Sequence, residues 1–269
     1  MYAPIIAILV TMFVMISATL HDIRSREVPD WHWMLLGAFA MFSAFFECGP
    51  LCGSLLSLGY SLLLLYMLSE RSVGFVGLIT LASSFSFLIV YTIISGDSSG
   101  WVTLFTSFFI LYLYHKGLIR GGADAKALVC LSMLFPVYPN SDHLIWNPIY
   151  PAGYAFNPVF SIFVLSLVSS CLVIFYIFCK NLRNGRIGLS SYQMSVAEAR
   201  IAFVWPLEDI KDGRKIRIKV CDDLETIYDR LEESGEDSVL VTPMIPFLLP
   251  IAFSTAFVLL CGSPLFCLL

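Results

Sequence analysis

The sequence has few charged residues. Asp, Glu, Lys and Arg make up 13% of its 269 residues, about half of the roughly 25% that is usual in a soluble domain. The hydrophobic fraction is 58% and the mean hydropathy is +0.82. Most of the charged residues fall in 180–237, so the rest of the chain is nearly without charge. This distribution excludes a soluble single-domain protein and indicates an integral membrane protein with one hydrophilic module.

Metal-ligand patterns and strongly basic segments are also missing. The eight cysteines include no Cys-x-x-Cys and no Cys/His pair at the spacing of structural zinc. The net charge is −4, and no cluster of Lys and Arg is dense enough to hold a phosphate backbone. The sequence therefore predicts no metal, no cofactor and no nucleic-acid partner.

Eight apolar windows approach the roughly 17–25 residues with which an α-helix crosses a hydrocarbon core of about 30 Å. They cover approximately 3–20, 31–46, 51–69, 73–94, 101–114, 125–137, 158–179 and 245–262. The second, fifth and sixth are short, so flanking residues must extend them toward the headgroups. The predicted fold is an all-α polytopic membrane protein with about eight transmembrane helices and a small cytoplasmic α+β module.

The positions of Lys and Arg predict the orientation of these spans. No basic residue precedes the first apolar run, and Arg24 and Arg26 follow it, which predicts that the N-terminus lies outside. If the spans alternate, all 16 Lys and Arg lie on the inner side or at an inner helix end. We therefore expect a multi-pass protein of the cell membrane with residues 180–244 in the cytoplasm.

Three regions follow from this topology: a transmembrane helical core over 1–179, the cytoplasmic module over 180–244 and a final span within 245–269. Ser195 and Glu198 stand at capping-box spacing, which predicts a helix start inside the module. The other predicted elements of the module are strands at 201–205, 215–220 and 238–242, a turn at Asp212-Gly213, and a helix from Asp222 or Asp223 to Glu233.

Two acidic residues at predicted helix ends are candidates for chemistry, because a carboxylate there is costly without a compensating partner. Asp22 ends the first span and Asp124 begins the sixth, and the topology places both at the inner surface. If their helices are neighbours, the two carboxyls can share one proton. The ionised group can then activate a water that attacks a peptide carbonyl while the protonated group donates to its oxygen. Gly121 and Gly122 permit close approach of a substrate backbone.

Simpler interpretations stand beside this one. In the simplest, each acid only caps a helix or pairs with Arg24 or Lys126 at the headgroup level. Asp30 is predicted to be the N-cap of the second span, and Lys126 to be an anchor that reaches toward the headgroups. Two competing hypotheses concern the whole protein, namely a proton-coupled secondary transporter and a non-catalytic membrane scaffold. Cys48 and Cys52 are both predicted outside, so a disulfide between them is conceivable.

Three short segments carry a resemblance to a known family. Asp22 through Asp30 is similar to the signature of Asp, six residues, Pro and Asn or Asp in type IV prepilin peptidases. Gly121 through Lys126 resembles their GxGD box, which often reads GGADAK in the archaeal preflagellin and prepilin branch. Thr242 through Phe247 resembles the TPxxPF element before their last span. The motif positions are Pro29, Asp30, Gly121, Gly122, Ala123, Lys126, Pro243, Pro246 and Phe247.

The resemblance implies a multi-pass aspartyl protease with Asp22 and Asp124 as its catalytic pair. Such enzymes cleave the basic leader of pilin or archaellin precursors at the cytoplasmic face, so these precursors and the bilayer are the expected partners. Acids on the predicted inner surface can attract a basic leader: Glu27, Asp30, Glu70 and the run Glu232 to Asp237. The sequence departs from the family at Ala123, which stands in place of Gly, and in the interval between the acids, which holds two more spans than expected. It also lacks the cysteine-bearing domain that bacterial relatives associate with N-methylation.

Overall fold

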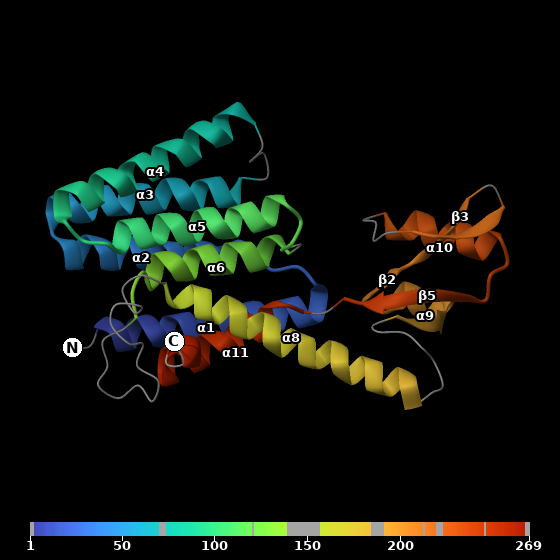
Figure 1. Ribbon diagram of the computed structural model, residues 1–269. Coiled ribbons are helices and arrows are strands. Elements are labelled where there is room, and N and C mark those ends of the chain that lie inside the picture. The colour runs from blue at the N-terminus through green and yellow to red at the C-terminus, as the bar shows by residue number, and fades with distance from the viewer. Residues whose placement is uncertain are drawn as a thin grey trace. The chain divides into compact units, whose positions relative to one another are not determined.

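The computed structural model describes residues 3–69, 74–119, 121–138, 157–183, 191–211, 213–218, 223–244 and 246–266. The chain divides into two compact units, of which the first contains 1–167 and 246–269 and the second contains 168–245 (Figure 1). Each unit is described by itself below. Glu70, and the loop 138–157 between the sixth and seventh predicted spans, fall almost wholly outside the described residues.

The first unit is a bundle of apolar helices. Each of the eight predicted windows overlaps one described helix of the chain. The helices are α1 (Ala3–Ser25), α2 (Trp31–Cys48), α3 (Pro50–Leu68), α4 (Phe75–Ser95), α5 (Ser99–His115), α6 (Gly122–Leu134), α8 (Pro158–Arg183) and α11 (Leu248–Cys261). The helix α8 begins in the first unit and continues into the second, and the short 3₁₀ turn η1 (Pro264–Phe266) follows α11.

Four of the described helices are long and apolar enough to cross a membrane. They are α1 from Ile5 to Ser25, α3, α4 and α8, while α11 is a shorter apolar helix. The protein is thus mostly helical with several membrane-span candidates, which agrees with the coarse part of the predicted fold class. The number of crossings and their orientation remain predictions.

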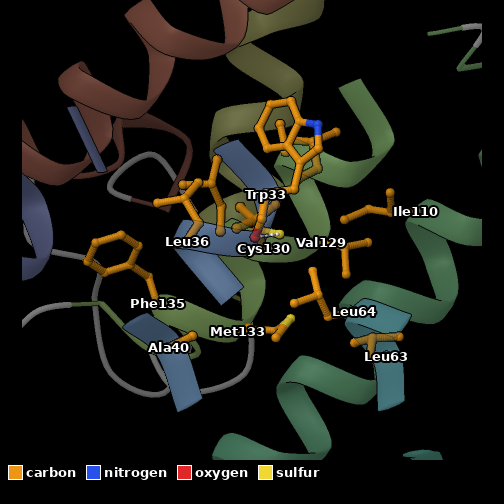
Figure 2. Close-up of a cluster of buried hydrophobic side chains, with 14 of the residues drawn as sticks. Trp33, Leu36, Ala40, Leu63, Leu64, Ile110, Val129, Cys130, Met133 and Phe135 are labelled. Atoms are coloured by element: carbon orange, nitrogen blue, oxygen red, sulfur yellow. Dashed lines mark hydrogen bonds between the residues drawn. The ribbon is translucent and has the colours of Figure 1, made fainter. Parts of the chain in front are cut away.

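The helix α2 is central to the packing. It contacts α1, α3 and α6, and α6 in turn contacts α5 and α11. In Figure 2, Trp33 and Leu36 of α2 share one buried cluster with Cys130 of α6 and Leu64 of α3. Gly53 allows α3 to approach α2 closely, because a Cβ there would lie 2.7 Å from the Phe45 backbone. The two acid-bearing helices, α1 and α6, are therefore both held by α2.

Buried hydroxyl groups add directional contacts between helices that are otherwise apolar. Thr103 of α5 donates to the Ser132 carbonyl of α6 at 3.2 Å, and the Ser107 and Ser132 hydroxyls lie 3.1 Å apart. Tyr60 of α3 reaches the Thr103 hydroxyl at 3.5 Å. Such contacts between small polar side chains hold helices together where lipid removes the hydrophobic driving force.

The second unit contains a three-stranded antiparallel sheet with helices packed on it. Its strand order is β1-β5-β2, and a separate hairpin joins β3 to β4. Val239 and Val241 of the central strand are buried together with Ile227 and Leu231. The elements are β1 (Tyr192–Ser195), α9 (Val196–Ile201), β2 (Val204–Pro206), β3 (Glu208–Lys211), β4 (Arg214–Arg217), α10 (Leu224–Glu233) and β5 (Ser238–Pro243).

Most of the elements expected in this segment are present. The Ser195 hydroxyl accepts a hydrogen bond from the Glu198 backbone at 3.2 Å and starts α9, as the capping-box spacing predicted. The strand expected from residue 201 is wrong at its beginning, because the helix that Ser195 caps continues through Ile201 and β2 begins only at Val204. Gly213 has a φ of +70° and lies in a turn, as expected, while its predicted partner Asp212 lies outside the described residues.

A two-point ion pair links α10 to the hairpin. Arg230 donates to both carboxylate oxygens of Asp209 at 2.9 and 2.7 Å. These hydrogen bonds hold the pKa of Asp209 below its usual value of 3.8. A depressed pKa in the folded state means that the pair stabilises the unit above the ordinary carboxyl pKa and loses this contribution as the pH falls through the lowered value.

Replacing Asp209 with Asn should therefore lower the stability of the hairpin at neutral pH and make that stability depend less on pH in the acid range. We expect amide hydrogen exchange in β3 and α10 of the full-length protein to show an opening free energy lower by about 1 kcal/mol near pH 7. The difference from wild type should vanish near pH 2. Glu233→Gln is the matched control, because Glu233 is exposed on the same helix. An equal loss in the control would show that the ion pair is not the cause.

Candidate active site

Asp22 lies in the last turn of α1, where the helix ends at Ser25. Arg26 adopts a left-handed backbone with φ of 59°, and its N–H donates to the Asp22 carbonyl at 3.1 Å. This conformation closes the helix in the way that a C-terminal cap does. The Arg26 charge is near enough to act on the Asp22 carboxylate, which is partly exposed.

The Asp22 carboxylate meets the start of the last apolar helix. The Leu248 backbone N–H, the first of α11, hydrogen-bonds to it. The Thr19 hydroxyl donates to the Leu248 carbonyl at 3.5 Å, which adds a second contact between α1 and α11. The first N–H groups of a helix have no partner inside it and carry partial positive charge. Phe247, the residue before α11, supplies no side-chain cap, so a carboxylate from another helix takes that place.

The contact between Asp22 and Leu248 involves the end of the segment Thr242–Phe247, which leads into the last helix. Pro246 and Phe247 lead directly into α11, and the Phe247 side chain packs on the core of the first unit. Thr242 and Pro243 instead end strand β5 in the second unit. The segment Thr242–Phe247 therefore spans the boundary between the two units.

The segment between Asp22 and α2 is held by a buried histidine that the sequence reasoning missed. His32 is completely buried, and its Nδ1 lies 2.8 Å from the Pro29 carbonyl. Because that oxygen can only accept, Nδ1 carries the hydrogen and Nε2 accepts from the Ser17 hydroxyl at 3.0 Å. The His21 ring packs edge-on against His32 at 5.3 Å. A histidine three residues after Pro29 was the available signal, since that spacing reaches back over one helical turn.

Asp124 occupies the first turn of α6 and folds back over Gly121. A Cβ added to Gly121 would overlap Oδ2 of Asp124 and would lie 2.7 Å from its Cγ. The Gly121 backbone has ordinary dihedral angles, with φ of −75° and ψ of 116°. Glycine is needed here for space rather than for an unusual conformation. The Asp124 carboxylate fills the volume that any side chain at position 121 would take.

The structure brings the two acids together. Asp22 is near enough for its charge to act on the Asp124 carboxyl, and both side chains are partly exposed. Their helices are held by the same neighbours, because α2 and α11 each contact both α1 and α6. Two carboxyls 102 positions apart in the sequence thus lie at one site, at the end of α1 and the start of α6.

Two interpretations from the sequence need correction. Lys126 was expected to reach toward the headgroups, but its Nζ lies 2.6 Å from Oδ1 of Asp30 and its side chain is 19% exposed. Asp30 does stand at the N-cap position of α2, but its side chain makes no capping hydrogen bond. It pairs with Lys126 instead, because an unpaired ammonium group against a packed helix seam would lose its hydration without compensation.

Gly122 faces away from Asp124. The atom nearest to an added Cβ there is the Tyr114 hydroxyl, at an ordinary contact distance of 3.6 Å. Gly122 and Lys126 line a cavity of about 130 Å³ together with the ends of α3 and α5, where the Tyr66 hydroxyl lies 3.2 Å from His115 Nε2. A larger apolar cavity of about 420 Å³ lies at the opposite end of α5, around Trp101 and Phe105.

The cysteines and possible metal ligands form no further site within the described part of the chain. Cys48 and Cys52 are free thiols, so the conceivable disulfide between them is absent. Among the residues that the structure describes, no group of three or more His, Cys, Asp and Glu side chains could hold a metal ion.

The fold and the site are those of a mostly helical protein with several membrane-span candidates and a pair of carboxyl groups at one end of its helix bundle. The chain is 23% identical to the preflagellin peptidase of Methanococcus voltae over 261 residues, which cover 93% of this chain and 92% of that protein. No protein-family model matches. The similarity over nearly the whole length confirms the resemblance to the preflagellin and prepilin peptidase family.

The two adjacent glycines should respond differently to the same substitution. Gly121→Ala must displace the Asp124 side chain into another rotamer, so we expect the purified protein in detergent to unfold at a lower temperature, by an amount equivalent to about 1 kcal/mol. Gly122→Ala should be neutral or slightly stabilising, because Ala is favoured over Gly inside a helix. Thermal unfolding of the two variants measures this difference. Equal melting temperatures would contradict the close contact between Gly121 and Asp124.

Proposed function

We propose that this protein is a membrane-embedded aspartyl endopeptidase that removes the basic leader of type IV pilin-like or archaellin precursors. The proposal is carried by one observation, which is that the carboxyls of Asp22 and Asp124, at the ends of two different helices, lie near enough for the charge of one to act on the other. The named relative acts, by its name, on preflagellin, and this supports a peptidase of the same substrate class.

The two carboxyls divide the chemistry between them. One is ionised and takes a proton from a water molecule, whose oxygen attacks the carbonyl carbon of the scissile peptide. The other is protonated and donates to the carbonyl oxygen, which gives a tetrahedral diol. As the C–N bond breaks, the departing amine receives the proton that the first carboxyl took from water, and the second carboxylate recovers its proton from the diol. Two neighbouring carboxyls hold a single proton because like charges at short range cannot both ionise. That proton belongs to the pair rather than to either residue.

The remaining contacts of the site suit this chemistry. The Leu248 N–H and the positive end of α11 stabilise negative charge on Asp22. Asp124 lies over Gly121, which has no side chain that could block the approach of an extended peptide to that carboxylate. We infer that the peptide enters along this face of α6.

In the membrane, the proposal includes eight crossings with the N-terminus outside and residues 180–244 in the cytoplasm. Under this arrangement Asp22 and Asp124 face the inner surface, where a leader that has not crossed the membrane would be available. The segregation of Lys and Arg supports this orientation.

The acids expected to attract a basic leader are not equivalent. Asp30 is paired with Lys126, and Glu232 with Arg200, so much of their charge is already compensated. Glu27 is exposed in the segment that follows Asp22. We therefore assign the attraction of a cationic leader mainly to Glu27 within the part of the site that the structure describes.

Single substitutions of the acids test the proposal. Co-expression of Asp22→Asn or Asp124→Asn with candidate type IV pilin-like precursors should leave the leader attached, with cleavage at least about 10³-fold slower than wild type, because either change removes one partner of the acid–base pair. The loss of the leader is measured by the shift of the precursor on a gel and by mass spectrometry. Both variants should accumulate in the membrane like wild type.

Glu47→Gln is the matched control, since Glu47 is an exposed acid at the end of α2 and outside the site. It should cleave at the wild-type rate. A scaffold would keep its function in all three variants. If the protein were a proton-coupled transporter, the two Asp→Asn variants would lose transport and even wild type would cleave no precursor. The absence of cleavage by wild type would overturn the proposed peptidase.

A further inference from the structure

We propose that the Lys126–Asp30 ion pair is a positioning contact that sets the register of α2 against α6 and thereby the separation of the two catalytic carboxyls. The inference rests on the proposed function. Neither residue touches the reacting atoms. Lys126 is two residues after Asp124 on α6, and Asp30 follows Asp22 by eight residues at the start of α2.

The pair belongs to a specific arrangement of the two helices. Lys126 Nζ and Asp30 Oδ1 are 2.6 Å apart. One turn deeper, the Cys130 thiol donates to the Trp33 carbonyl at 3.6 Å, shown as the dashed line in Figure 2. The steps from Asp30 to Trp33 and from Lys126 to Cys130 run in the same direction, so the helices are parallel along this seam. Both contacts define the same register.

The rest of the seam offers little that would select one register. Figure 2 shows Cys130 of α6 beside Trp33 and Leu36 of α2, and all three side chains are buried. Apolar packing of this kind is not directional, and α6 presents mainly small side chains near its start, including the fully buried Ala125 and Ala127. A single polar pair in an apolar seam is a known means of specifying register.

The connection from the ion pair to each carboxyl is short and stiff. On α6 the helix itself joins Lys126 to Asp124. On the other side, His32 holds the Pro29 carbonyl at 2.8 Å and also contacts Ser17 of α1 at 3.0 Å, so the start of α2 is tied to the helix that carries Asp22. A shift at the ion pair therefore moves one carboxyl relative to the other. Displacements of about 1 Å in a catalytic arrangement can lower the rate by roughly 10²-fold.

The test uses purified full-length protein in detergent with a precursor that wild type cleaves. We expect Asp30→Asn and Lys126→Met each to lower kcat by roughly 10- to 100-fold, with KM within about threefold of wild type. The reversed pair, Asp30→Lys combined with Lys126→Asp, should regain at least about tenfold over the weaker of Asp30→Lys and Lys126→Asp alone, because it restores the attraction between the two positions. Thermal unfolding of the same variants is measured in parallel.

Lys116→Met is the matched control, because Lys116 also lies after an apolar helix but packs over the Tyr112 ring at 5.7 Å. It should leave kcat unchanged. If wild type is active and kcat is unaltered in the single variants, the positioning role is overturned, whereas the proposed peptidase is not. Rescue of the unfolding temperature by the reversed pair without rescue of kcat also overturns it, since the contact would then be structural only. An inactive wild type refutes the proposed peptidase, and the positioning role falls with it.

Discussion

Charged groups at the ends of apolar helices must find compensation, and this constraint organises the first unit. Transferring a carboxylate or an ammonium group out of water without a partner costs several kcal/mol of free energy. The structure answers this demand twice within one region. Asp22 receives the Leu248 N–H at the start of α11, and Asp30 pairs with Lys126. The helix ends are thereby drawn together.

These contacts explain why three short segments that are far apart in the sequence belong to one site. The first ends with Asp30 and the second with Lys126, and the ion pair joins them directly. The third precedes α11, whose first N–H contacts the acid that opens the first segment. The first two segments therefore each supply a candidate catalytic acid and one member of the ion pair, and the third leads into the helix whose first N–H contacts Asp22. His32 completes the arrangement by holding the bend between Asp22 and α2.

The second unit follows different physical rules. It holds most of the charge of the chain, and its stability depends on a small core around Val239, Val241 and Leu231 together with ion pairs such as Arg230 with Asp209. Its last strand leads into the segment that enters α11, so the chain passes from a charged α+β unit to an apolar helix within a few residues. The similarity to a preflagellin peptidase extends over 93% of the chain and thus includes both units.

The sequence by itself predicted where the helices form and which two acids are candidates for chemistry, because apolar runs and isolated charges are local properties that can be read residue by residue. It identified the helix that Ser195 caps and the turn at Gly213 for the same reason. It did not determine that Lys126 pairs with Asp30, that His32 holds Pro29 or that Leu248 contacts Asp22. These contacts join residues between 3 and 226 positions apart, and for all but the shortest only the packing of α1, α2, α6 and α11 decides which side chains meet. Gly121 illustrates the difference, since its need for glycine arises from the volume of a folded carboxylate and not from its own backbone angles.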